Sequence, residues 1–299
     1  MKITENLKSV HFKLNLIIMK NLIFVFLILG LITSYAQEPL EVKIEPRPSS
    51  QGVQSAFEVI VPQATSDDAI KLWEKTITSG GLFSKSPKME NIKDEWIIKD
   101  VVIDEISPDP FTVYSQVSSF PGNIYVRIFL QNEDGFLGSP GTSEQAVGAA
   151  SRYIRNYAVE LYRQAVEKEL KEEENKLKSL EGDYNKMDRQ NRSYDKKINK
   201  AEKEEGSLRG DLKDNKKLLK ETRKSDEWEN SPEEKAASKE ELEKNIKDVN
   251  KDIKKAQKTQ SRFEKKINKN ETEQEGLEEE IELQKERVSE VKRKLESIR

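Results

Sequence analysis

The chain has 299 residues, with 52 Lys and Arg against 55 Asp and Glu, one His and no Cys. The lack of Cys excludes disulfides, so a folded domain here must be stabilised by an apolar core. The single His, His11, lies in a segment that we expect to be removed. Its removal excludes Ser-His-Asp and Cys-His catalysis and nearly all zinc sites.

Residues 1–36 have the pattern of a signal peptide. Lys20 supplies the positive charge, and an apolar run covers 22–32. The small residues Ser34 and Ala36 stand at positions −3 and −1 relative to a cleavage site before Gln37. We therefore expect an exported protein, periplasmic or secreted.

Two alternatives concern this segment. Translation could start at Met19, and the apolar run could stay as an anchor, although it is short for a membrane-spanning helix. Without residues 1–36 the chain keeps 48 basic and 54 acidic residues, a net charge near −6.

The next part of the chain predicts a lead-in followed by a small domain. Residues 37–54, rich in Pro, predict an extended lead-in, and residues 55–160 predict an α+β head. The expected elements are a strand at 57–61, a helix with the apolar stripe Ile70, Trp73 and Ile77, a strand at 95–106, a turn at 107–110, and strands at 111–117 and 124–130. This β-α-β-β-β-α order predicts a small antiparallel-sheet sandwich with helices on one face.

The last helix of the head begins at the capping box of residues 142–145. Its first turns, up to Leu161, have an apolar stripe too wide for a coiled-coil seam, so we expect them to lie on the sheet. The same helix then continues as the first arm of a coiled coil.

Residues 161–299 predict an antiparallel coiled-coil hairpin with a turn near 226–232. Both arms have apolar residues in alternating steps of three and four. Folding the chain between Asn230 and Ser231 places residue i opposite residue 461 − i, and the seam positions of the two arms then match along the whole length. A parallel dimer of straight helices is the alternative.

One predicted layer is polar on both sides, because Asn191 falls opposite Asn270. Two amides can satisfy each other, whereas one amide facing Leu could not, so the pair is expected to set the register. The alternative is a loosely specified coil, since Glu205 and Gln274 are also seam residues.

The turn between the arms contains one partner-contact candidate. Ser231 and Pro232 predict the start of the second helix, and Trp228 precedes them. Trp228 either contacts a partner or folds over the end of an arm.

Few residues could perform chemistry. Asp104, Glu105 and Asp109 lack the spacing of a calcium-binding loop, and ordinary solvated turns are the favoured interpretation. Lysine pairs such as 196–197 and 265–266 are interleaved with acidic residues, so we expect no nucleic acid partner. No metal or cofactor is expected.

Several strings, among them VPQATSDDAIKLWEK, DEWIIKDVVIDEIS and NIYVRIFLQNEDGFLGS, precede a long charged helical tail. With the leader, they resemble a functionally uncharacterised family of exported Bacteroidetes proteins with a small α+β head and a coiled-coil tail. The resemblance implies an extracytoplasmic setting and supplies no catalytic residue.

These features predict a non-enzymatic exported protein that acts as a structural spacer or protein-interaction module through its hairpin. The alternative is a periplasmic holdase chaperone with helical arms, which would require an oligomer and apolar patches on the arms. We expect an unknown protein partner and a monomeric hairpin.

Overall fold

The computed structural model describes residues 40–78, 88–224 and 232–299, which fall into two compact units. The head comprises the described residues up to Glu167 together with Ser297–Arg299, and the hairpin comprises Lys168–Glu296. The expected signal peptide lies outside the described residues. Among those described, no helix has an apolar stretch long enough to cross a membrane.

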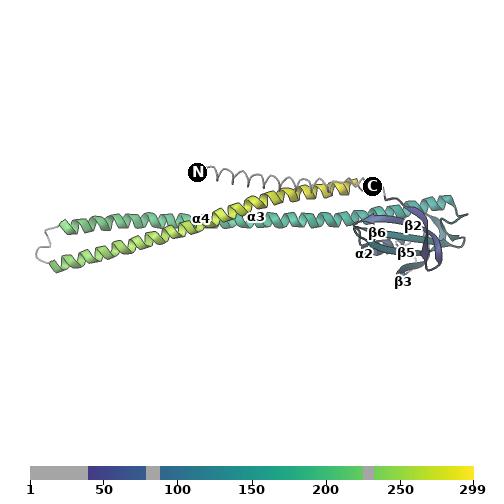
Figure 1. The fold of residues 1–299 in the computed structure, drawn as a ribbon, viewed down its shortest axis with the longest axis horizontal. Helices are drawn as coiled ribbons and strands as arrows, with labels where there is room; N and C mark the ends of the chain where they lie inside the picture. The colour runs from purple at the N-terminus through teal and green to yellow at the C-terminus, as the bar shows by residue number, and fades with distance from the viewer. Residues whose placement is uncertain (1–39, 79–87, 225–231) are drawn as a thin grey trace, which may run out of the picture. The chain divides into compact units, whose positions relative to one another are not determined.

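The head is an antiparallel sheet with helices packed on it, which confirms the predicted fold class (Figure 1). The strand order is β1-β2-β6-β5-β4-β3, with β7 paired to β6. The strands are β1 Lys43–Ser49, β2 Gly52–Pro62, β3 Glu90–Ile92, β4 Glu95–Ile103, β5 Ser107–Phe120, β6 Asn123–Asn132 and β7 Gly135–Phe136. β2, β4, β5 and β6 correspond to the four expected strands.

Three helices accompany the sheet: α2 Ser66–Thr78, α3 Glu144–Lys224 and α4 Pro232–Ser297. Thr65 caps α2, because its hydroxyl accepts from the Asp68 amide at 3.2 Å and donates to the Asp68 carboxylate at 2.7 Å. Ser143 caps α3 by accepting from the Ala146 amide at 3.4 Å.

α2 and the first turns of α3 cover one face of the sheet. Trp73 of α2 donates its indole N–H to Ser115 Oγ on β5 at 2.8 Å, and the Tyr157 hydroxyl of α3 donates to the Ala69 carbonyl at 2.8 Å. The β6 residues on this face are 1% exposed or less, as their alternation predicts: Ile124, Val126, Ile128 and Leu130. This face holds the main core.

The second face of the sheet is covered by the hairpin of β1 and β2. The Ser50 amide lies 3.3 Å from Glu95 Oε2, and Gln116 Nε2 lies 3.1 Å from the Pro48 carbonyl. Because β1 and β4 are separated by three strands in the sheet order, these contacts require a strongly curled sheet. A small second core lies beneath, formed by Ala56, Tyr114, Phe129 and Phe136.

The turn expected at 107–110 is instead the start of β5. The chain turns at residues 104–106, and Ser107 already pairs with Ile103. Pro108 and Pro110 fit in this strand because β6 pairs with β5 only from Thr112 onward, so residues 107–111 have one open edge.

Two further features differ from the expected strands. β1 occupies part of the range expected as a lead-in, and its Pro46 and Pro48 are tolerated because β1 is an edge strand. β4 has an irregularity between Ile98 and Val101, where Asp100 has a φ of 57°. This bulge contributes to the bending of the strand.

The turns between strands follow from local residue chemistry. Pro121 and Gly122 join β5 to β6, and Gly122 has a φ of 79°, as a type II turn requires. Lys93 and Asp94 join β3 to β4 with φ values of 52° and 65°, the left-handed pair of a tight hairpin turn.

In the hairpin unit, α3 and α4 pack side by side as antiparallel helices (Figure 1), which confirms the helical hairpin. Small and β-branched residues form the most buried part of the seam, each 2% to 8% exposed: Ala201, Ile253, Ala256, Ile281, Val288 and Val291. Contacts between the helices occur over most of their length, from Glu169 with Lys294 to Arg223 with Glu243.

Candidate interaction surface

The predicted polar layer of the hairpin contains a direct amide pair. Asn270 Nδ2 donates to Asn191 Oδ1 at 2.8 Å, and Asn191 Nδ2 donates to Gln274 Oε1 at 3.0 Å. Gln274 Nε2 in turn lies 3.5 Å from the Tyr184 carbonyl. Each of these partly buried amides therefore has a hydrogen-bond partner. That this layer sets the register remains a prediction.

A second polar contact joins two adjacent layers of the seam. Gln260 and Gln257 of α4 donate to Glu205 of α3 at 2.9 Å and 2.8 Å. In the 461 − i register Glu205 faces Ala256 and Gln260 faces Ala201, so each long polar side chain has a small residue opposite. From the sequence, Glu205 indicated only a loosely specified coil, although Ala256 already faced it in the same register.

A third contact again joins a Gln of α4 to a Glu of α3. Gln284 Nε2 donates to Glu173 Oε2 at 2.6 Å and to the Glu173 carbonyl at 3.0 Å. Hydrogen bonds from Lys176 and Gln284 lower the pKa of Glu173. Hydrogen bonds from Arg209, Gln260 and Gln257 likewise lower the pKa of Glu205. Both carboxylates are thus held charged in the seam.

An aromatic pair lies between these polar layers. The rings of Tyr194 and Phe263 are stacked with centroids 5.4 Å apart. Lys197 Nζ lies 5.0 Å from the Phe263 centroid, and Lys266 Nζ lies 5.2 Å from the Tyr194 centroid. These distances permit cation–π attraction, which offsets part of the repulsion between the nearby lysines.

The other predicted contact residue, Trp228, lies outside the described residues, as does the rest of the expected turn up to Ser231. Its role as a partner contact remains a prediction.

The second face of the head contains a charged cluster built on neighbouring strands. Arg127 donates to Glu58 at 2.5 Å, and Arg47 donates to Glu58 at 2.8 Å and to Glu45 at 2.6 Å. Burial alone would raise the pKa of Glu58, but the hydrogen bonds from Arg127 and Arg47 outweigh it and hold the pKa below its usual value. The charges of the two guanidinium groups and the two carboxylates cancel, so this cluster has the character of a structural ion-pair network.

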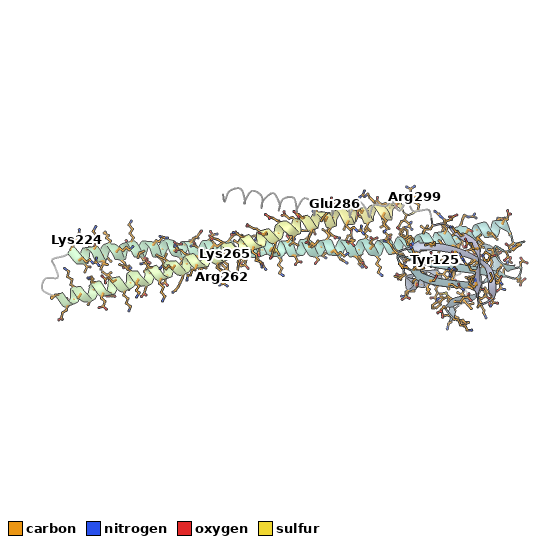
Figure 2. The ribbon with its side chains drawn as sticks, in the orientation of Figure 1. Tyr125, Lys224, Arg262, Lys265, Glu286 and Arg299 are labelled. Atoms are coloured by element: carbon orange, nitrogen blue, oxygen red, sulfur yellow. The ribbon has the colours of Figure 1, made fainter. Side chains whose placement is uncertain are left out.

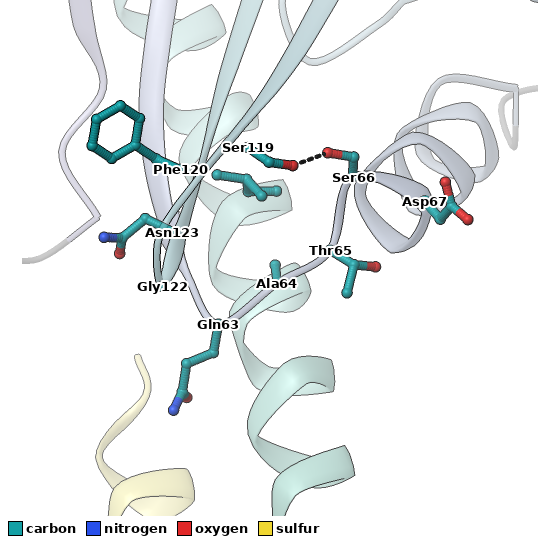
Figure 3. A pocket seen from close by; sticks show the side chains of 10 residues that line it. Gln63, Ala64, Thr65, Ser66, Asp67, Ser119, Phe120, Gly122 and Asn123 are labelled. Atoms are coloured by element: carbon teal, nitrogen blue, oxygen red, sulfur yellow. Dashed lines mark hydrogen bonds between the residues drawn. The ribbon is translucent and has the colours of Figure 1, made fainter.

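A cavity of about 430 Å³ lies where the turn before α2 meets the turn between β5 and β6 (Figure 3). Ser66 Oγ and Ser119 Oγ are 2.8 Å apart at its rim. Asp67 is the one titratable side chain among the described residues that line it. This lining offers neither paired carboxylates nor a nucleophile with an adjacent base.

The carboxylates singled out in the sequence lie at the surface. Asp104 and Glu105 are exposed in the turn after β4, and Asp109 accepts from the Ser107 hydroxyl at 3.2 Å. Within the described ranges, the acidic side chains form no group that could hold a metal ion.

Comparison with protein-family models and with curated proteins finds no match to this chain. The resemblance to exported Bacteroidetes proteins remains a prediction.

Proposed function

We propose that this is a non-enzymatic exported protein that works as a structural spacer or protein-interaction module through its hairpin. The observation that supports this proposal is the set of three polar contacts across the seam, at Glu173, Asn191 and Glu205. They favour a single register, and a single register gives the hairpin a fixed surface.

Sliding one helix by a heptad would break all three contacts. In either direction Asn191 would face Phe263 or Leu277, and Glu205 would face Val249 or Phe263. These side chains are partly buried in the seam, and a polar group left there without a partner is unfavourable. Three such groups together would strongly disfavour the slipped hairpin.

The length of the hairpin suits a spacer. At about 1.5 Å of rise per residue, α3 from Lys168 to Lys224 extends on the order of 85 Å. Its outer positions are charged, which keeps such a long surface soluble. The holdase alternative would require apolar patches on the arms, and among the described hairpin residues the exposed large hydrophobics are Leu218 and Leu283.

Photo-crosslinking in the exporting cell tests the protein-contact role. A photoreactive residue replaces Leu218 or Leu283, which are 51% and 49% exposed, and exposed Asp109 of the head serves as the matched control. We expect a defined protein adduct from a hairpin position and none from Asp109. Adducts from the head alone would contradict the proposal.

Export is tested separately by the intact mass of the purified protein. We expect a form that begins at Gln37, and an Ala36→Lys variant should accumulate uncleaved because a signal peptidase requires a small residue there. A mature protein that retains residues 19–36 would contradict cleavage.

A further inference from the structure

Pairing of α3 with α4 gathers basic residues into one block of the hairpin. Because Asn191 lies opposite Asn270, residues 189–203 of α3 lie beside residues 258–270 of α4. We call residues 189–203 and 258–270 the basic collar. It holds eleven basic and three acidic side chains, a net charge of +8, with the basic ones Arg189, Arg192, Lys196, Lys197, Lys200, Lys203, Lys258, Arg262, Lys265, Lys266 and Lys269.

The adjoining block has the opposite charge. We call residues 179–188 and 271–282 the acidic collar. It holds ten acidic and one basic side chain, a net charge of −9, with the acidic ones Glu181, Asp183, Asp188, Glu271, Glu273, Glu275, Glu278, Glu279, Glu280 and Glu282. The two collars are of similar length, roughly 20 Å each at 1.5 Å per residue.

Most of this charge is exposed and is not neutralised inside the chain. Lys196, Lys200 and Lys265 make no ion pair with any described residue, and the same is true of Glu275 and Glu279. Arg262 and Lys265 lie midway along α4 (Figure 2). The ion pairs Arg192 with Asp188 and Lys269 with Glu273 join the two collars at their boundary.

Such sorting by sign is unfavourable for an isolated hairpin. Lys196 and Lys200 are like charges four residues apart on one helix, as are Glu271 with Glu275. Like-charge pairs at this spacing destabilise a helix. Alternating signs would avoid the cost, so the blocks point to a partner of complementary charge.

We propose that the partner is a second copy of this chain, whose hairpin packs antiparallel beside the first. A two-fold axis near the Asn191 and Asn270 layer places each basic collar on the acidic collar of the other copy. Such an interface is self-complementary and closed, so it gives a dimer and not a filament. This inference deepens the proposed function and rests on the hairpin as its binding element.

The charge balance favours a second copy over a polyanion. A nucleic acid or an anionic membrane would be attracted to the basic collar and repelled by the equally large acidic collar beside it. A second copy would contact both collars at once, because its own acidic and basic collars face the basic and acidic collars of the first copy. From the sequence, the Lys-rich pairs 196–197 and 265–266 predicted no basic field because acidic residues are interleaved with them. The hairpin brings the two pairs to the same level, where basic residues outnumber acidic ones.

The test uses the full chain, in the form that accumulates on expression, and measures its molar mass by light scattering. We expect a dimer at about 50 mM salt that dissociates at about 500 mM salt, because exposed charges are screened beyond a few ångströms at high ionic strength. A monomer at low salt and micromolar concentration would overturn the proposal, and so would an open-ended series of larger species.

Charge reversal in each collar identifies the contacts. The triple variant Lys196→Glu, Lys200→Glu and Lys265→Glu should be monomeric, and so should the triple variant Glu275→Lys, Glu279→Lys and Glu280→Lys. Mixing the two variants should restore a heterodimer, since each carries the charge that the other has lost. A matched control, Lys213→Glu, Lys216→Glu and Lys220→Glu, lies outside both collars and should remain dimeric.

The outcomes separate this inference from the proposed function. Circular dichroism establishes that each variant keeps its helices. If both collar variants stay dimeric, or if the mixture fails to associate, self-association through the collars is wrong while binding of another protein through the hairpin still stands. Stoichiometric, salt-sensitive binding of a DNA oligonucleotide by a monomeric wild-type chain would instead assign the basic collar to a polyanion.

Discussion

The buried carboxylate of Glu58 on β2 links this strand to its two neighbours in the sheet, β1 and β6. The residue is 8% exposed, and its carboxylate accepts from guanidinium groups on β1 and β6. A carboxylate that loses one such partner while buried would keep its desolvation cost without the compensating hydrogen bond.

Glu58→Gln should destabilise the head by about 2 kcal/mol at neutral pH, because the amide accepts more weakly from Arg47 and Arg127. The pKa of Glu58 is lowered in the folded state, so its contribution is present above the unfolded-state pKa of about 4.3 and is lost as pH falls through the lowered value. The stability difference between wild type and variant should therefore shrink below about pH 4.

Urea unfolding at several pH values measures this difference. Glu45→Gln is the matched control, because the Glu45 side chain is 46% exposed and its ion pair with Arg47 is worth little. A Glu58→Gln effect that is equal at pH 7 and pH 3 would show that the charge is not what stabilises the cluster.

At the scale of one element, we predict that the polar contacts in the seam of α3 and α4 lower its stability and in return favour a unique register. Asn191→Leu should lower hairpin stability by about 1–3 kcal/mol, because Asn270 would be left without its partner in the layer. The double variant with Asn270→Leu should recover that stability or exceed it, since an apolar pair fills the layer.

A double-mutant cycle by thermal denaturation measures the coupling between the two residues. Asn199, on the outer surface of α3, is the control position and should tolerate Leu with little change. Additive effects of Asn191→Leu and Asn270→Leu would contradict direct coupling.

The seam was readable from sequence because its period is strict. The 461 − i register placed Asn191 opposite Asn270, and the structure has a hydrogen bond between them. The alternation of β6 was equally clear, because a strand with one face on a core repeats every second residue.

The elements that sequence reasoning missed depend on contacts far along the chain. Pro46 and Pro48 argue against a strand until β1 is known to be an edge. The second core under the β1–β2 hairpin joins Ala56, Tyr114 and Phe136 from three different strands, and no local pattern encodes such contacts. The separation of basic and acidic residues into two collars is likewise visible only once α3 and α4 are paired.

For the whole molecule, the direction of the hairpin has a direct test, since the chain contains no Cys. Leu212→Cys combined with Val249→Cys should form a disulfide within one chain, because these positions fall in the same seam layer of the 461 − i register. Non-reducing gel electrophoresis would show a monomer of altered mobility. The dimer proposed above leaves this result unchanged, because each hairpin closes on itself.

Leu212→Cys combined with Ile281→Cys, more than 30 residues out of register, is the control and should not crosslink within the chain. Crosslinks formed only between chains by the Leu212 and Val249 pair would support parallel straight helices instead.

The two prolines of β1 have a consequence for how the head can meet other molecules. A free sheet edge normally offers amide hydrogens to which an extended peptide can add as a new strand. Pro46 and Pro48 have no amide hydrogen, so β1 lacks a backbone donor at these two positions. The head is thereby protected at this edge from strand-by-strand aggregation, and recognition there would have to use side chains instead of the backbone.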